Sequence, residues 1–498
     1  MLSLLLITAL VASPEQPCVA ILPPTTDQAD AASLGWAFAD ALTARLLAHS
    51  KFDRGTGQRQ YPLSVFGWRE SRSALREAGF DAKTLLSARR AERVASFLGA
   101  DALWVGMFAQ KSDSIELIWQ LKGVRAGQER KLSIDKERLA LGVEQVFRAV
   151  IADLGLDDGA VPDHALPVQP YEVERAYGEG LAVLAEQSMD PRAQVLLSPA
   201  LLESAHAALA RATTLSPQFA SAWAWQSISS AMLGRTAAAD QELARAMQDL
   251  GYTPTTTLAV YYSFWRSDRA TDALAALQAS INTHQGFMLG RGYLGQAMLR
   301  ANHPHEALTA FTAYLALAPG NPWAVIKHSE ALARIGQHEQ AISELKTLLG
   351  KLGSSPLLQG ALVARYTDAL RLKDARATAE AGLKQFPFDP ELLARLAQID
   401  LEQDNLPAAQ QHAESAVANL AKSANHEFAG FAQLMLGHVL ARLGRRDEAV
   451  GALRMADRLG VDVYERTVLL RDTHLKAFFE DPRCPIRSEG VPLPPEQP

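Results

Sequence analysis

The stretch AHAALARATTLSP, residues 205–217, begins with an alanine that recurs at a fixed interval along the chain. Six further alanines follow at steps of 34 residues, and one more follows after a step of 40 residues. The eight positions are Ala205, Ala239, Ala273, Ala307, Ala341, Ala375, Ala409 and Ala449. A fixed period in this range predicts stacked supersecondary units, because one such unit alone cannot bury its apolar face.

Residues at fixed distances from these alanines predict two helices in each unit. Four residues after an alanine stands a mostly large apolar side chain such as Leu209 or Leu243, one helical turn further on the same face. Glycine recurs five residues before the alanine, where a turn between helices is expected, in Gly234, Gly336 and Gly444. Proline recurs twelve residues after it, in Pro217, Pro319 and Pro387. The alanine itself leaves room for the two helix backbones to approach each other.

This 34-residue helix-turn-helix period resembles the tetratricopeptide repeat. We expect about eight repeats and a capping helix over residues 171–483, beginning with a helix over 171–185. The run 187–199 carries two prolines and interrupts the first repeat. The Pro-rich residues 484–498 are expected to be disordered. The acidic turn residue Asp404 is interpreted as a helix cap.

The segment before the repeats predicts a small α/β domain over residues 17–156, followed by a linker over 157–170 that contains three prolines. Short apolar runs predict strands, and the i, i+3, i+4 spacing of apolar residues predicts helices. The expected strands are 18–22, 63–66, 102–108, 115–121 and 129–134. The expected helices are 34–49 with Ser33 as its cap, 87–98 ending at Gly99, and 139–154. Trp104 and Trp119 fall within the strand patterns and are expected to pack in the core.

Three strings in this segment resemble the TolB-like N-terminal domain, which often stands directly before tetratricopeptide repeats. They are VAILP at 19–23, FADALT at 38–43 and LGADALWVG at 98–106. The resemblance implies a protein-interaction domain of the bacterial envelope. The expected fold is therefore an α/β N-terminal domain plus an all-α tetratricopeptide repeat superhelix.

Composition and the N-terminus limit the classes of function. A net charge of −6 argues against a general nucleic-acid binder, so no nucleic-acid partner is expected. The two cysteines, Cys18 and Cys484, cannot form a disulfide framework or a four-ligand zinc site. Residues 1–16 begin MLSLLLITALVAS and predict a signal peptide and a periplasmic or secreted protein, with an uncleaved anchor or a mis-assigned start as the alternative. No later apolar stretch is long enough to predict a transmembrane span in the mature chain.

The period also predicts a binding face. Residues seven positions before the alanines are expected on the first helix of each pair, which lines the concave surface of such arrays, and residues four positions before them are expected near the same face. Several are arginines, and two aromatic residues stand close to them. The candidate partner-binding residues are Arg235, Tyr262, Trp265, Arg266, Arg269, Arg300, Arg334 and Arg371. Because arginine binds carboxylates with two parallel hydrogen bonds, we expect an acidic or C-terminal peptide as the partner. The alternative is that these arginines pair with nearby Glu and Asp residues of the chain itself.

No catalytic arrangement emerges from the sequence. It contains no phosphate-binding glycine loop and no H-E-x-x-H motif, and His303 and His305 lack a third metal ligand nearby. We therefore expect neither an enzyme nor a cofactor or metal site. The favoured function is a protein-interaction scaffold of the bacterial envelope. The alternative is a sensory or regulatory component that acts with a separately encoded kinase, cyclase or transcription regulator.

Overall fold

The computed structural model describes residues 16–484, apart from residues 50, 54–57, 61–62, 78–87, 157–167, 187–197, 252, 267–269, 285–286, 421–427, 460, 462 and 480–482. The expected signal peptide, nearly all of the expected linker and tail, and the interruption of the first repeat therefore lie outside the described residues. The chain divides into two compact units. The first contains Met1–Gln187, Pro199–Gly295 and Thr309–Ala324, and the second contains Ser188–Ser198, Gln296–Leu308 and Val325–Pro498.

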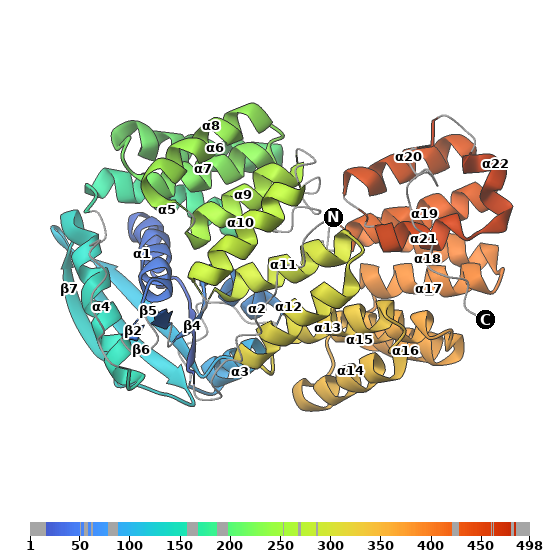
Figure 1. Ribbon diagram of the computed structural model, residues 1–498, viewed down its shortest axis with the longest axis horizontal. Helices are drawn as coiled ribbons and strands as arrows, with labels where there is room; N and C mark the ends of the chain where they lie inside the picture. The colour runs from blue at the N-terminus through green and yellow to red at the C-terminus, as the bar shows by residue number, and fades with distance from the viewer. Residues whose placement is uncertain are drawn as a thin grey trace. The chain divides into compact units, whose positions relative to one another are not determined.

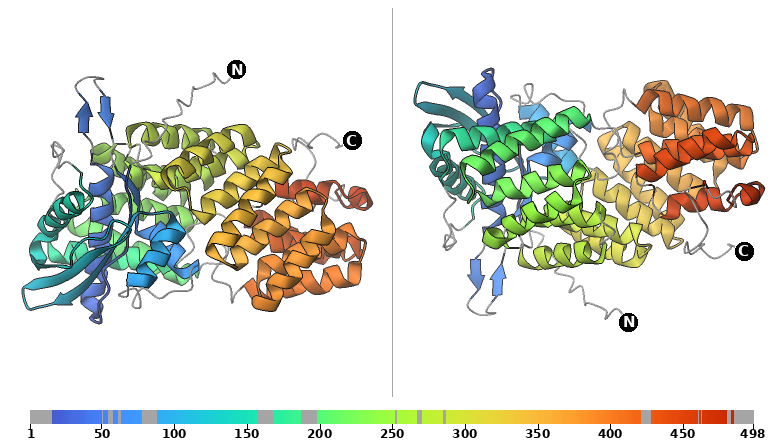
Figure 2. Two further views of the ribbon diagram at one scale, coloured as in Figure 1. Left: turned by 90° about the horizontal axis from the view of Figure 1, so that it is seen from below. Right: turned by 90° about the horizontal axis from the view of Figure 1, so that it is seen from above.

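The first unit contains a five-stranded sheet with the strand order β4-β1-β5-β6-β7. Strand β1 is parallel to β4 and β5, whereas β6 runs antiparallel to both β5 and β7. The strands are β1 Cys18–Ile21, β4 Ser64–Phe66, β5 Ala102–Gln110, β6 Ser114–Gly123 and β7 Arg130–Asp135. Strands β2 Lys51–Asp53 and β3 Gln58–Gln60 form a separate antiparallel pair, which Figure 2 shows in blue. The strands expected at 102–108 and 115–121 are confirmed as β5 and β6, which pair with each other.

Helices cover both faces of this sheet. Helices α1 Ala29–Leu47 and α4 Leu139–Asp153 lie side by side on one face (Figure 1). Helices α2 Trp68–Glu77 and α3 Ala88–Leu98 contact each other and the sheet. Successive strand residues point to opposite faces, so alternate residues of β1 and β5 enter different cores. Leu103 packs in the core that contains α3, whereas the Trp104 ring stacks on Phe38 of α1 at 5.9 Å.

Three local features of this region differ from the expectation. Helix α1 begins at Ala29, five residues earlier than expected, so Ser33 lies inside it and Gln28 is its N-cap. Helix α2 and the strands β2 and β3 were not expected at all. The expected burial of Trp104 and Trp119 is confirmed, since their side chains are 0% and 3% exposed.

Eight pairs of helices follow in the described part of the chain. Their bounds are α5 Tyr171–Glu186, α6 Pro199–Leu215, α7 Ala220–Met232, α8 Thr236–Leu250, α9 Pro254–Arg266, α10 Ala270–Thr283, α11 Met288–Arg300, α12 Pro304–Leu317, α13 Pro322–Arg334, α14 His338–Leu352, α15 Pro356–Asp368, α16 Leu372–Gln385, α17 Pro390–Glu402, α18 Leu406–Asn419, α19 Ala429–Arg442 and α20 Arg446–Arg458. Each recurring alanine lies on the second helix of its pair and is 0% exposed. The alanine period therefore marks the contact between paired helices, as expected.

In six of the eight pairs the structure describes the turn between the two helices, and each of these turns has a residue in the left-handed region. Gly234, Gly336 and Gly444 have φ of 76°, 83° and 76°, which glycine adopts without steric penalty. Asn302, Leu370 and Asp404 occupy the same turn position in other pairs, with φ of 59°, 58° and 57°. The interpretation of Asp404 as a cap is wrong, because the adjacent Asn405 is the N-cap of α18 and accepts from the Ala408 backbone.

In the first unit, the α/β region packs directly against the repeat helices. Helix α5 crosses α1 so closely that a Cβ on Gly178 would lie 1.7 Å from the Ser33 carbonyl oxygen. The core beneath β1 and α3 also contains Met288, Tyr314 and Leu317 from the repeat helices. The boundary expected at residues 157–170 therefore falls within one compact unit.

In the second unit, the chain ends in short helices that cover the last pair. They are α21 Val463–Leu470, a 3₁₀ turn Thr473–Leu475 and α22 Lys476–Phe479. Leu469, Leu475 and Phe478 pack in the same core as α19 and α20. These helices bury apolar surface that the end of a stack would otherwise expose to water. In the described residues, no helix combines the length and apolar character needed to cross a membrane.

Candidate functional site

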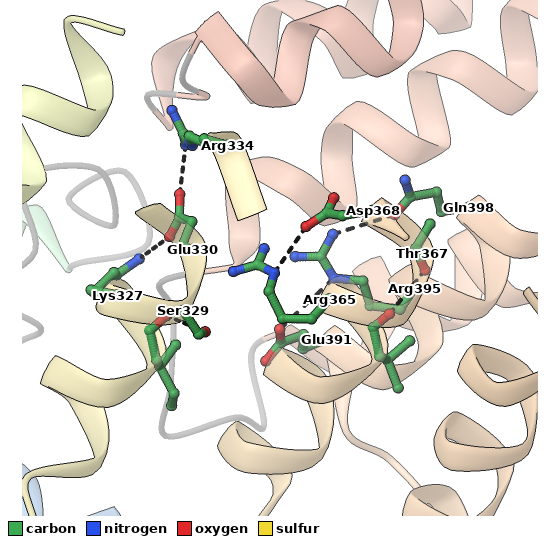
Figure 3. Close-up of polar contacts among 12 residues, drawn as sticks. Lys327, Ser329, Glu330, Arg334, Arg365, Thr367, Asp368, Glu391, Arg395 and Gln398 are labelled. Carbon is green, nitrogen blue, oxygen red and sulfur yellow. Dashed lines mark hydrogen bonds and ion pairs between the residues drawn. The ribbon is translucent and has the colours of Figure 1, made fainter. Parts of the chain in front are cut away.

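The first helices of the pairs in the second unit form the candidate binding face. First helices of neighbouring pairs contact one another, as α15 does with α17 and α17 with α19. Nearly every residue of α15 and α17 is buried, whereas α16 buries only Ala375, Ala379 and Gly382. Charged side chains on α13, α15 and α17, some buried and some half-buried, are shown in Figure 3. We call this set the inner charged row, which consists of Lys327, Glu330, Arg334, Arg365, Asp368, Glu391 and Arg395.

On α13, one glutamate holds two cations. The Lys327 Nζ lies 3.3 Å from Glu330 Oε2, and the Arg334 Nη2 lies 2.5 Å from Glu330 Oε1. Arg334 also donates from Nη1 to the Leu299 carbonyl oxygen at 2.8 Å. Its side chain is only 3% exposed, so the guanidinium is fixed by these bonds and is screened from water.

On α15 and α17, each arginine is likewise held by polar groups of its own helix. Arg365 donates from Nε to Asp368 at 2.9 Å, and Arg395 donates from Nη1 to the Gln398 amide oxygen at 3.3 Å. The Arg395 guanidinium also lies 4.0 Å from the centre of the Phe431 ring on α19. A glycine makes room for the Glu391 carboxylate, since a Cβ on Gly360 would lie 2.3 Å from it.

The last described pair adds a histidine and an arginine that hold one aspartate. Asp472 accepts from His438 Nε2 at 2.8 Å and from Arg442 Nη1 at 2.9 Å. Burial raises the pKa of Asp472, but the hydrogen bonds from His438, the His474 backbone and Arg442 outweigh it and hold the pKa well below its usual range. The carboxylate is therefore ionised at any ordinary pH and fastens the C-terminal helices to α19.

The arginines expected to bind a partner are mostly paired within the chain. Arg235 forms an ion pair with Glu203, and Arg371 pairs with both Glu339 at 3.1 Å and Asp374 at 2.7 Å. Arg334 is bound to Glu330 as described above, and Arg300 is partly buried. These pairs match the alternative expectation of pairing with nearby carboxylates. The side chains of Trp265 and Arg266, and residue Arg269, lie outside what the structure describes.

Tyr262 is covered by the α/β region of its own unit. Arg69 of α2 donates from Nη2 to the hydroxyl groups of Tyr262 on α9 and Tyr293 on α11, at 3.2 and 3.4 Å. The Arg69 guanidinium also lies 5.4 Å from the Trp225 ring on α7 and 5.9 Å from the Tyr262 ring. We call Trp225, Tyr262 and Tyr293 the aromatic cage. A partner therefore reaches Tyr262 only after α2 leaves.

The sequence analysis did not include α2 in the expected site. A signal for it is present, because Trp68, Ser71 and Leu75 have the spacing of one helical face and all three are buried. The same helix begins with a second contact to the repeats, because the Trp68 ring packs on the Trp225 ring in a tilted arrangement with 5.4 Å between the ring centres. Arg69 and the three residues of the aromatic cage are far apart in the sequence, and no local motif connects them.

Buried carboxyl groups lie next to this contact. A cavity of about 50 Å³ between α1, α4, α5 and α7 is lined by Asp40, Glu174 and Tyr177 together with apolar side chains. Asp40 accepts from Trp68 Nε1 at 2.8 Å and from the Tyr177 hydroxyl at 2.6 Å. Burial and the nearby Asp40 raise the pKa of Glu174 from 4.5 to about 8. Burial raises the pKa of Glu70 from 4.5 to about 7, although its backbone hydrogen bonds and the charge of Arg69 lower this pKa.

A search of the part of the chain that the structure describes finds no group of three or more His, Cys, Asp or Glu side chains able to hold a metal ion. Cys18 is buried in β1, and burial together with Asp101 and Glu70 raises the pKa of its thiol well above the usual value. This thiol is therefore protonated and unreactive at neutral pH.

The comparisons with known proteins agree with the helix pairs. Residues 298–366 match the family model "Tetratricopeptide repeat". No curated protein matches the chain.

Several solved structures are similar over part of the chain. A tetratricopeptide repeat protein from Parabacteroides merdae is 12% identical with a TM-score of 0.42, over 53% of this chain and 99% of that one. PilF from Pseudomonas aeruginosa is 15% identical with a TM-score of 0.35, over 44% and 95%. A thermophilic TPR protein from Thermus thermophilus is 21% identical with a TM-score of 0.31, over 36% and 99%. The family match and the eight described helix pairs together support a tetratricopeptide repeat array that follows a small α/β region.

Proposed function

We propose that this protein is a non-enzymatic interaction scaffold of the bacterial cell envelope, and that it binds a partner peptide on the first helices of the second unit. Tetratricopeptide repeat proteins generally act as protein-interaction scaffolds, which supports the first part. The envelope assignment follows from the apolar N-terminal stretch and from the TolB-like strings of residues 19–106.

One observation carries the choice of the second unit. In the first unit, the first-helix face at α7, α9 and α11 is covered by α2 through Trp68 and Arg69. In the second unit, the corresponding face on α13, α15 and α17 presents the inner charged row. The partner site proposed from the sequence therefore narrows to the candidate residues that belong to the second unit, which are Arg300, Arg334 and Arg371.

The inner charged row also changes the expected chemistry of the partner. Each described cation in it is paired with a carboxylate or amide of its own helix. A partner carboxylate would therefore have to compete with an existing pair for the guanidinium. An acidic peptide would have to displace Glu330 or Asp368. A peptide of mixed charge, whose cations and anions match those of the row, fits this face without breaking the existing pairs.

A matched pair of charge reversals tests the proposed face. Glu402 is exposed at the end of α17 and occupies the repeat position of Arg334 and Asp368, whereas Glu380 is exposed on the second helix α16. Partners are first captured by crosslinking the wild-type chain in intact cells and are identified by mass spectrometry. Glu402→Lys should weaken capture of a direct partner by about tenfold, and Glu380→Lys should leave it unchanged. Equal capture by both variants would reject the inner face as the binding site.

Cell fractionation tests the compartment separately. The proposal expects the chain in the periplasmic or membrane fraction. Recovery of the protein in the cytoplasmic fraction alone would reject the envelope assignment and leave the peptide-binding face to be tested on its own.

A further inference from the structure

The aromatic cage holds an arginine that does not belong to the repeats. Its three side chains come from the first helices of three successive pairs, α7, α9 and α11. Trp225, Tyr262 and Tyr293 are 2%, 0% and 7% exposed, and the two tyrosine hydroxyls lie 3.4 Å apart. The Tyr293 ring is also packed on Tyr261 at 4.6 Å, so neighbouring repeat side chains fix its position. The repeats themselves build this cage, and α2 only fills it.

The chemistry of the cage selects a planar cation. Electron-rich ring faces attract a guanidinium, and hydroxyl oxygens accept hydrogen bonds from its N–H groups. Arg69 uses both features, with its guanidinium within 6 Å of two rings and one nitrogen bonded to two hydroxyls. A neutral side chain of the same shape would keep the apolar contacts and lose the attraction to the rings.

The contact with Arg69 is incomplete. Its Nε and Nη1 atoms are buried and form no hydrogen bond to a described residue. No carboxylate of the described chain lies within ion-pair distance of its guanidinium. A buried donor without an acceptor weakens the association that buries it. Arg69 therefore forms fewer hydrogen bonds in the cage than an arginine can form. An arginine of a competing ligand can bind more tightly by forming more of them.

We propose that the aromatic cage is a binding site for an arginine side chain presented on a helix, filled in cis by Arg69 and taken by an arginine-bearing helix of a partner protein when α2 leaves. The sequence of α2, WRESRSALRE, defines the kind of ligand: an aromatic residue followed by arginine in the first turn of a helix. This site is separate from the face proposed for the second unit.

The test uses a labelled peptide of residues 63–77 and the full-length chain, with affinity measured by fluorescence anisotropy. Arg69→Ala removes the guanidinium from the cage and so weakens the contact that holds α2 on the repeats. Arg72→Ala is the matched control, because the Arg72 guanidinium lies 5.4 Å from the Trp36 ring, away from the cage. A second peptide carries citrulline in place of the first arginine, which keeps the shape and removes the charge.

The proposal expects the arginine peptide to bind the Arg69→Ala chain about tenfold more tightly than it binds the wild type or the Arg72→Ala chain. It expects the citrulline peptide to bind the Arg69→Ala chain about tenfold more weakly than the arginine peptide does. Adding Tyr262→Phe and Tyr293→Phe to Arg69→Ala should also weaken binding, because the hydroxyl acceptors are lost while the rings remain. Equal affinity of the two peptides, or equal affinity of the Arg69→Ala and Arg72→Ala chains, would overturn the proposal. If the Arg69→Ala chain does not show the wild-type circular dichroism spectrum, Arg69→Met replaces it, and the same outcomes decide.

Discussion

The Tyr177 hydroxyl on α5 donates a hydrogen bond of 2.6 Å to the Asp40 carboxylate on α1, and both side chains are buried. This bond joins the α/β region to the first repeat helix across 137 residues of sequence. The same carboxylate accepts from Trp68 of α2, the helix that reaches the aromatic cage. Asp40 therefore connects α1, α2 and α5 at one point.

Removal of the Tyr177 hydroxyl should destabilise the first unit. Tyr177→Phe keeps the ring but leaves the buried Asp40 with one hydrogen bond fewer, which costs about 1–3 kcal/mol. Urea denaturation followed by circular dichroism measures the loss. Tyr366→Phe on α15 of the second unit is the control, because Tyr366 is a buried tyrosine whose ring contacts the cations of Lys346 and Arg371, and it should have a smaller effect. Equal losses in the two variants would contradict the role given to Asp40.

The stability of the first unit should fall as the pH rises from about 5 to 8. The folded-state pKa values of Glu174 and Glu70 are raised to about 8 and about 7 from 4.5, so the folded state retains protons that the unfolded state has lost. Their contribution to stability is fully present below pH 4.5 and is lost as the pH rises through about 7 and about 8. For each group the upper limit of the slope is about 1.4 kcal/mol per pH unit.

Glu174→Gln isolates one of these two groups. Glutamine does not titrate, so the decline in unfolding free energy between pH 5 and 8 should be smaller than in the wild type. Urea denaturation at each pH measures it. The same slope in the variant and the wild type would show that Glu174 does not bind the extra proton.

Leu370→Gly should stabilise the second unit. Leu370 has φ of 58° and is 72% exposed, so its side chain gains little from packing while its backbone lies in a region that disfavours it. Glycine relieves a strain of about 1 kcal/mol, and the preceding repeat already has glycine at this turn position, Gly336. The reverse change, Gly336→Leu, should lower stability by a similar amount. Thermal unfolding checks both, and a lower midpoint for Leu370→Gly would be inconsistent with a strained turn.

Two glycine-to-alanine changes should have opposite effects. A Cβ on Gly178 would lie 1.7 Å from the Ser33 carbonyl oxygen, so Gly178→Ala forces α1 and α5 apart and should lower stability by several kcal/mol. A Cβ on Gly350 of α14 meets no atom within 4 Å, so Gly350→Ala should raise stability by about 1 kcal/mol. Denaturant titration of both variants measures the difference. A tolerated Gly178→Ala would mean that α1 and α5 are not packed this closely.

The sequence predicted the features that depend on local spacing. The recurring alanines located the contact inside each helix pair, and Gly336 located a turn, because both depend on residues within one repeat. The pairing of Arg371 with Glu339 could be expected only as one of two alternatives, since both a partner and the chain itself supply carboxylates. The turn at Leu370 was hidden because its residue type does not favour a positive φ.

The features that depend on long-range packing could not be predicted in this way. The cage meets Arg69 across sequence separations of up to 224 residues, and no period relates those positions. The burial of Glu174 and Asp40 follows from the close crossing of α1 and α5, which one glycine permits. A helical pattern at Trp68, Ser71 and Leu75 was available, but nothing local showed that the helix would cover the repeats.

Site-specific photo-crosslinking tests the central claim, that partners bind the first-helix face of the second unit, most directly. A photoreactive amino acid is placed at Glu402 on the first helix α17 or at Glu380 on the second helix α16, and the cells are irradiated. The account predicts a crosslinked partner from position 402 and none from position 380. Crosslinks from position 380 alone, or from neither position while the partner is still captured by the wild-type chain, would contradict it.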